Sequence, residues 1–172
     1  MYRSRNQALL TLLRLVGGRI SEILQLKVKH VFDGKEMVDT LTFERKIMKG
    51  KKKSRTVSLH DQCKEQLLPL CKHRSGNDWL FESTETEGEH MTRQNAHMII
   101  KKAAAKAQLK DQKRISAHAF RKSFAGSMYE ASGHDLLQTA AAMGHDSPET
   151  TRKYLAVNHD KLNKAIMNQS DI

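Results

Sequence analysis

Two stretches in the last third of the chain carry the pattern that decides the fold: ISAHAFRKSF at residues 115–124 and AAMGHDSPETTRKYL at residues 141–155. The first begins a predicted helix that runs to Gly133, because its apolar residues recur at helical spacing. In the second, Ser147 and Pro148 predict a helix start, since serine is a favoured N-cap and proline is favoured at the first helical position. Four side chains with anion-binding or nucleophilic chemistry lie in these stretches: His118, Arg121, His145 and Tyr154. We interpret them as one reactive site.

The chemistry of this cluster points to a phosphate. His118 and Arg121 lie three positions apart, so they share one helix face and could hold two oxygens of a phosphate. A further helix is expected from about residue 135 to 143, closed by Gly144. Tyr154 is expected about two turns into the helix that follows, where its hydroxyl could act as a nucleophile.

The beginning of the chain supplies a second arginine. Apolar residues at helical spacing predict a helix from about Asn6 that stops at Gly17-Gly18. Ser21 is the expected N-cap of a short second helix, with Glu22 in its first turn. Arg19 therefore lies at the break between two helices. Its planar guanidinium would add a second fork for the same phosphate, as stabilisation of a highly charged phosphorane requires.

A basic hairpin is expected in the first half. MVDTLTF at residues 37–43 and TVSL at residues 56–59 are rich in β-forming residues. The intervening ERKIMKGKKKSR contains a glycine and many cations, which predicts a strongly basic turn that contacts phosphates.

The remaining segments are mostly helical. Asp61 is a candidate cap for a helix in which Pro69 predicts a kink or an early end. Residues 79–81 form a short apolar segment, either an edge strand or a loop anchor, and Thr92 caps the next helix. The expected fold is a single α+β domain, mostly helical, with a small antiparallel sheet.

Composition favours a polyanionic partner. The chain has 172 residues, 38% of them hydrophobic, and 30 Lys and Arg against 19 Asp and Glu give a formal net charge of +11. Nucleic acid is the first candidate partner and an anionic membrane surface the second. The sequence contains no apolar run long enough to span a bilayer and no signal-peptide pattern, so a cytoplasmic location is expected. Cys63 and Cys71 are too far apart along a helix to bridge easily, and we expect free thiols. No close Cys or His pairing has zinc-ligand spacing.

Three segments resemble the tyrosine recombinases, also called phage integrases. GGRISEILQL is similar to the family's first-arginine box, HAFRKSFA to its His-x-x-Arg box, and MGHDSPETTRKYL to the box that ends in the tyrosine. The order of the boxes agrees, and so does the nine-residue step from His145 to Tyr154. One His-x-x-Arg would be a weak signal, but three boxes in order are specific. The resemblance runs from residue 5 to about residue 155.

The resemblance implies a defined reaction. Tyr154 would attack a DNA phosphodiester, form a 3′-phosphotyrosyl bond and free a 5′-hydroxyl, and a 5′-hydroxyl would later reverse the step without a metal or cofactor. Arg19 and Arg121 would stabilise the phosphorane, His118 would assist proton transfer or hold the phosphate, and His145 would hydrogen-bond the phosphate.

The resemblance also implies a general acid in the hairpin turn. A lysine there would protonate the leaving 5′-oxygen, and the register of the turn favours Lys49, with Lys51 as the alternative. The predicted DNA contacts of the hairpin are Lys49, Lys51, Lys52, Lys53 and Arg55.

The resemblance extends to organisation and partners. Residues 1–172 would be a single catalytic domain without the N-terminal helical domain that completes a clamp on DNA, either an excised domain or a natural short protein. The expected partner is double-stranded DNA. The protein would bind it as a homotetramer and would be a monomer without it. Accessory DNA-bending proteins and a nucleoid-associated location are also expected. Residues 159–168 have the amphipathic pattern of a segment that packs on a neighbouring subunit.

Two other functions are compatible with these residues. A type IB topoisomerase would use a similar pocket to relax supercoils without exchanging strands between partners. A DNA-binding module that has lost catalysis would only occupy sites, although the complete set of residues argues against it. The prediction is a site-specific DNA recombinase.

Overall fold

The computed structural model describes residues 2–44, 54–109 and 111–155. Its elements in chain order are α1 (Tyr2–Val16), α2 (Ile20–Leu24), the 3-10 helix η1 (Val28–His30), β1 (Thr40–Phe43), β2 (Arg55–Ser58), α3 (Asp61–Cys71), α4 (Arg93–Lys106), the 3-10 helix η2 (Gln112–Arg114), α5 (Ala117–Ala131), α6 (Leu136–Met143) and α7 (Pro148–Arg152). The expected mostly helical α+β class is confirmed.

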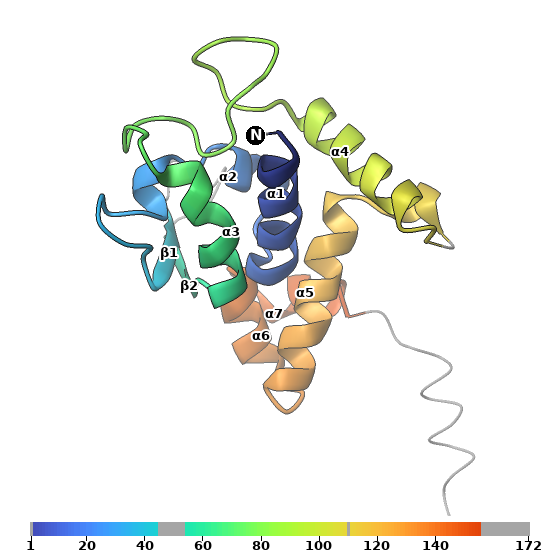
Figure 1. Ribbon diagram of the computed structural model, residues 1–172. Coiled ribbons are helices and arrows are strands. Elements are labelled where there is room, and N and C mark those ends of the chain that lie inside the picture. The colour runs from blue at the N-terminus through green and yellow to red at the C-terminus, as the bar shows by residue number, and fades with distance from the viewer. Residues whose placement is uncertain (1, 45–53, 110, 156–172) are drawn as a thin grey trace, which may run out of the picture.

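Helix α1 lies at the centre of the molecule. Figure 1 shows it between α3 and α5, and it packs against both. Its apolar positions fall on one stripe, and Leu9, Leu12, Leu13 and Val16 are buried. The main core surrounds this stripe with side chains from α2, both strands, α3 and α4. The two ends of the predicted site, which are far apart in sequence, are thus attached to one central helix.

The expected hairpin is present but shorter than predicted. Strands β1 and β2 pair antiparallel, with Thr40 opposite Ser58 and Phe43 opposite Arg55. Met37 does not extend β1, because it forms an isolated bridge with Phe32 instead. Residues 45–53 of the predicted basic turn lie outside the described residues.

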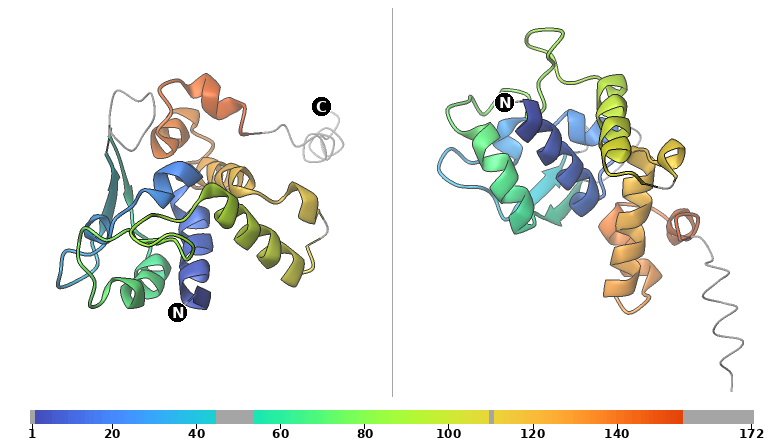
Figure 2. Two further views of the ribbon diagram at one scale, coloured as in Figure 1. Left: turned by 90° about the horizontal axis from the view of Figure 1, so that it is seen from above. Right: turned by 45° about the vertical axis from the view of Figure 1, so that its right-hand side comes forward.

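Helices α5, α6 and α7 form a second, smaller core. Phe124, Ala125 and Met143 are its buried centre, and Tyr154 and Leu155 pack against it. In Figure 1, α4 lies at the upper right and α6 and α7 lie at the bottom, with α5 between them. The side and top views in Figure 2 show the same separation. The C-terminal site residues therefore come from a subassembly that reaches α1 through α5.

Local signals were partly misread. Arg19, not Ser21, is the N-cap of α2. Its backbone N–H donates to the Glu22 side chain. Helix α7 ends at Arg152, so Tyr154 lies just beyond it in a turn closed by its N–H on the Thr151 carbonyl at 2.8 Å. Pro69 does not end α3 early, since it sits two residues before the last residue of the helix.

The segment at residues 79–81 and the cysteines are also placed. Trp79 forms only an isolated bridge with Lys27, so the segment is a loop anchor rather than an edge strand. Cys63 and Cys71 are free and buried, as expected. Across the described part of the chain, none of the helices has the length and apolar character needed to cross a bilayer.

Candidate active site

Arg19 is held by a buried carboxylate one turn away. Its backbone N–H donates to Glu22 Oε2 at 2.8 Å, and its Nη1 donates to Glu22 Oε1 at 2.7 Å. The Glu22 side chain is only 2% exposed, whereas that of Arg19 is 38% exposed. The carboxylate thus fixes the guanidinium at the start of α2 and leaves part of it open to solvent. The i, i+3 spacing of the two residues made this contact readable from sequence.

Arg121 is buried on the inner face of α5. Its Nη1 donates to the Gly17 carbonyl, and its Nη2 donates to the Met143 carbonyl at 2.8 Å. Burial lowers the pKa of Arg121, and the positive charge of Arg19 adds to the effect. Among the described residues, its buried Nε has no hydrogen-bond partner. The two arginines predicted to share a phosphate are therefore close enough to repel each other.

A hydrogen-bond chain connects His145 to both sides of the site. Arg121 Nη2 lies 3.1 Å from His145 Nε2, and His145 Nδ1 lies 2.7 Å from Thr151 Oγ1. Because a guanidinium only donates, we assign Nε2 as the acceptor, so the ring is neutral and Nδ1 donates to the threonine. A bond from Nε2 to a phosphate, as predicted, requires the other tautomer or the imidazolium.

The ring of Tyr154 lies between the two histidines. Its centroid is 5.0 Å from that of His118 and 5.2 Å from that of His145, and Arg121 Cζ lies 5.9 Å from it. His118 is exposed in the first turn of α5, which Ser116 caps. The structure thus gathers three of the C-terminal candidates around the ring of the fourth, Tyr154, and the bond from Arg121 to the Gly17 carbonyl connects them to the chain segment of Arg19.

The predicted DNA contact at Arg55 does not fit the structure. Its side chain is buried at 6% exposure, packs over the Phe43 ring with Cζ 4.6 Å from the centroid, and donates to the Ala142 carbonyl at 2.7 Å. The sequence predicts that Arg55 lies in the basic turn, whereas the structure makes it the first residue of β2. Burial lowers its pKa to about 10, with the charges of Arg121 and Arg19 as further causes. Lys49, Lys51, Lys52 and Lys53 lie outside the described residues.

Two contributors to the site were missed or undervalued. Thr151 is fully buried and orients His145, but a threonine within a short helix gives no sequence signal for such a role. From the sequence, Glu22 was noted only as an acidic residue in the first turn of the second helix. Its charge also favours the protonated forms of Arg55 and Arg121, so it acts on all three arginines.

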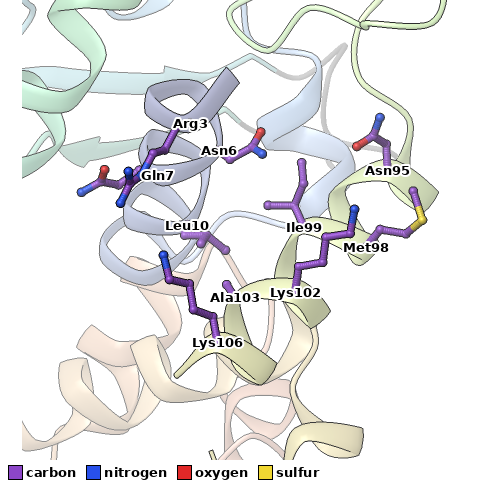
Figure 3. A pocket seen from close by; sticks show the side chains of 10 residues that line it. All are labelled: Arg3, Asn6, Gln7, Leu10, Asn95, Met98, Ile99, Lys102, Ala103 and Lys106. Atoms are coloured by element: carbon purple, nitrogen blue, oxygen red, sulfur yellow. The ribbon is translucent and has the colours of Figure 1, made fainter. Parts of the chain in front are cut away.

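A groove elsewhere on the molecule does not belong to this cluster. It lies between α1 and α4 and has a volume of about 470 Å³. Figure 3 shows Leu10 and Ile99 at its base and the amines of Lys102 and Lys106 along α4. The five described catalytic candidates do not line it.

Comparison with known proteins decides the family. A sequence profile for the phage integrase family matches residues 2–161. The chain belongs to this family. The resemblance carried by the three boxes is therefore confirmed.

Individual relatives agree. The chain is 29% identical over 147 residues to the probable integrase/recombinase YoeC of Bacillus subtilis, covering 86% of this chain and 75% of the relative. It is 30% identical over 173 residues to the tyrosine recombinase XerD of Rickettsia bellii, covering 95% of this chain and 55% of that protein. The chain thus spans about half the length of this XerD relative.

Solved structures give the same fold. The post-cleavage complex of the XerH site-specific recombinase with palindromic difH substrate aligns with a TM-score of 0.74 at 29% identity, covering 96% of this chain and 46% of that one. XerA recombinase aligns with a TM-score of 0.76 at 21% identity, covering 99% and 60%. The XerA likeness supports the fold of this family member.

Proposed function

We propose that this phage integrase family member cuts and rejoins DNA through Tyr154 as a site-specific recombinase. The observation that carries the proposal is the packing of the tyrosine ring between His118 and His145 beside the Arg121 guanidinium. A hydroxyl nucleophile, imidazoles for proton transfer and a cation for developing charge are the groups that phosphoryl transfer needs.

The arginines supply the electrostatic part of the reaction. Attack on a phosphodiester concentrates negative charge on the non-bridging oxygens, and preformed cations stabilise that charge without reorganising. Arg19 and Arg121 approach each other from two ends of the chain, and the lowered pKa of Arg121 reflects burial beside like charge. A phosphate between them would offset this repulsion.

The proposed cleavage exchanges one phosphorus–oxygen bond for another. The Tyr154 oxygen bonds to phosphorus and loses its proton, for which the exposed imidazole of His118, 5.0 Å away between ring centroids, is the proposed acceptor. The bond from phosphorus to the 5′-oxygen breaks, leaving a 3′-phosphotyrosyl linkage, and the 5′-oxygen takes a proton from a lysine. Lys49 is the proposed donor, with Lys51 as the alternative. A 5′-hydroxyl from the same or another strand reverses both bond changes.

Double-stranded DNA is the proposed partner, as the net charge of +11 and the DNA complex of the XerH relative support. In this proposal the chain acts as a catalytic domain. It forms a homotetramer on DNA, is a monomer without DNA, and acts with accessory DNA-bending proteins. The cytoplasmic, nucleoid-associated location stays a prediction. The relatives' names favour recombination over supercoil relaxation.

A covalent-trapping experiment tests the nucleophile. Duplexes with randomised arms and a nick beside the cleavage position lose their short 5′-hydroxyl fragment, so cleavage leaves a protein–DNA adduct visible on denaturing gels. The wild type should form it and Tyr154→Phe should not. Tyr129→Phe is the matched control, because Tyr129 also packs against a histidine, His134, at 5.0 Å between centroids.

The outcomes separate the alternatives. An adduct that persists in Tyr154→Phe would disprove the proposed nucleophile, and DNA binding without any adduct would favour the non-catalytic module. Relaxation of a supercoiled plasmid that contains none of the sequences recovered in the adducts would favour the topoisomerase.

A further inference from the structure

Arg55 joins two chain segments that both carry site residues. Its Nη1 donates to the Ala142 carbonyl at 2.7 Å, at the end of α6, and to the Val16 carbonyl at 3.4 Å, at the end of α1. The α1 end leads directly into the turn with Arg19, and the α6 end leads directly to His145. One buried guanidinium therefore spans the two sides of the site.

Arg121 makes the same connection one residue further along each segment. Its two terminal nitrogens donate to the carbonyls of Gly17 and Met143, which directly follow the two carbonyls that Arg55 uses. The arginines thus form adjacent braces between the same pair of segments. Arg121 has a proposed place in catalysis and contacts His145, whereas Arg55 Nη1 bonds only backbone carbonyls and its guanidinium packs over the Phe43 ring.

The local backbone accommodates Arg55 specifically. Gly144 closes α6 with a φ of +63°, and a Cβ added there would lie 2.5 Å from Arg55 Cδ. A glycine is therefore needed both for the left-handed conformation and for the approach of the side chain. Buried Nη2 of Arg55 has no partner among the described residues. Burying a guanidinium charge near other arginines costs desolvation free energy, which apolar side chains would avoid if they only had to hold the two segments together.

We propose that Arg55 is a positioning residue for strand cleavage, which sets the α1–α2 turn and the α6 end at the separation where Arg19, Arg121 and His145 meet one phosphate. This inference rests on the proposed function. Arg55 touches no reacting atom and acts through the two carbonyls it holds. Small displacements of charge-stabilising groups are costly, since a misplacement of about 1 Å lowers rates by as much as about 100-fold.

A matched arginine elsewhere provides the control. Arg74 also braces backbone carbonyls, donating to Leu70 at 3.2 Å and to Trp79 at 2.7 Å, but those segments carry no site residue. Loss of Arg74 should weaken the fold without changing the chemistry. Arg55→Met and Arg74→Met remove the same guanidinium and leave a similar apolar stem.

The experiment compares single-turnover cleavage at saturating DNA on two substrates, one with a normal scissile phosphate and one with a methylphosphonate at that position. The methylphosphonate lacks one negative charge, so misaligned arginines matter less for its cleavage. On phosphate, Arg55→Met should be about 10- to 100-fold slower than wild type, with a DNA Kd changed less than about threefold. On methylphosphonate the gap should shrink below about threefold, while Arg74→Met stays within about twofold on both.

Several results would overturn the inference. Wild-type rates for Arg55→Met on phosphate, or equal slowing on both substrates, would leave Arg55 as an ordinary structural brace. If Arg55→Met does not fold, Arg55→Lys undergoes the same comparison, and equal slowing on both substrates again rejects the proposal. A wild type that forms no adduct refutes the proposed function itself, whereas a cleaving wild type beside an unaffected Arg55 variant refutes only this inference.

Discussion

Replacing Glu22 with glutamine should destabilise the protein far more than a similar change at the surface. The carboxylate of Glu22 is 2% exposed and uses both oxygens on Arg19, at 2.8 Å to the backbone nitrogen and 2.7 Å to Nη1. Its charge also favours the protonated forms of Arg55 and Arg121. Glu22→Gln keeps the size and one acceptor oxygen but removes the charge that faces three guanidinium groups.

The magnitude follows from the bonds that change. A hydrogen bond to a charged group contributes about 1.5–3 kcal/mol and a neutral one about 0.5–1.5 kcal/mol. Glutamine can keep the backbone N–H bond in neutral form, but its amide group cannot accept from Nη1 as well. Because Arg19 is partly exposed, solvent recovers some of the loss. The expected decrease in the free energy of unfolding is about 1–3 kcal/mol at neutral pH.

Urea unfolding followed by Trp79 fluorescence measures this decrease, with an unchanged dependence on urea as evidence that both states keep their compactness. Asp39→Asn is the control, since Asp39 pairs with Lys64 at 2.6 Å but is 91% exposed. That change should cost much less stability, because an exposed ion pair contributes little. Equal losses in the two variants would refute the reasoning, because burial of the carboxylate would then have no effect. A Glu22→Gln protein that is as stable as wild type would refute it too.

Three further predictions concern Gly17, Thr151 and the two cysteines. Gly17→Ala should lower the free energy of unfolding by at least about 2 kcal/mol, because Gly17 has a φ of +62° and an added Cβ would overlap the Phe124 ring; a stable variant in thermal melts would contradict this. Thr151→Val should slow adduct formation about tenfold, since it removes the oxygen that orients His145 at 2.7 Å, and an unchanged single-turnover rate would show that the orientation does not matter. Burial raises the pKa of Cys63 and Cys71 from 9.0 to about 11, which reduces the thiolate fraction near pH 8 about 100-fold, so thiol reagents should react only as the protein unfolds. Because the folded-state pKa of each thiol is raised, the stability contributed by the neutral thiols is present below pH 9 and lost as the pH rises through 11. Rapid labelling of the native protein would contradict the burial of the thiols.

Local patterns predicted most of the fold. Helical spacing and caps located α1, α4 and α5 to within a few residues, and turn and β-forming residues located the hairpin. These predictions succeeded because hydrophobic periodicity and capping depend on neighbours a few positions away. The same kind of signal misplaced the cap of α2, since the Glu22 side chain, and not a residue before the helix, satisfies the first backbone donor.

The sequence by itself determined which residue types are available for phosphate chemistry and in what order, from Arg19 through Arg121 to Tyr154, because motif spacing is a local property. Only the tertiary structure decided how they meet. Arg55, predicted as a DNA contact in the basic turn, bonds the Ala142 carbonyl of α6, and Thr151 bonds His145. These contacts join backbone carbonyls and side chains across crossings of the chain, which spacing cannot encode. Because Arg55 is buried, its guanidinium bonds backbone carbonyls and does not face DNA, since a guanidinium removed from water must find acceptors within the protein.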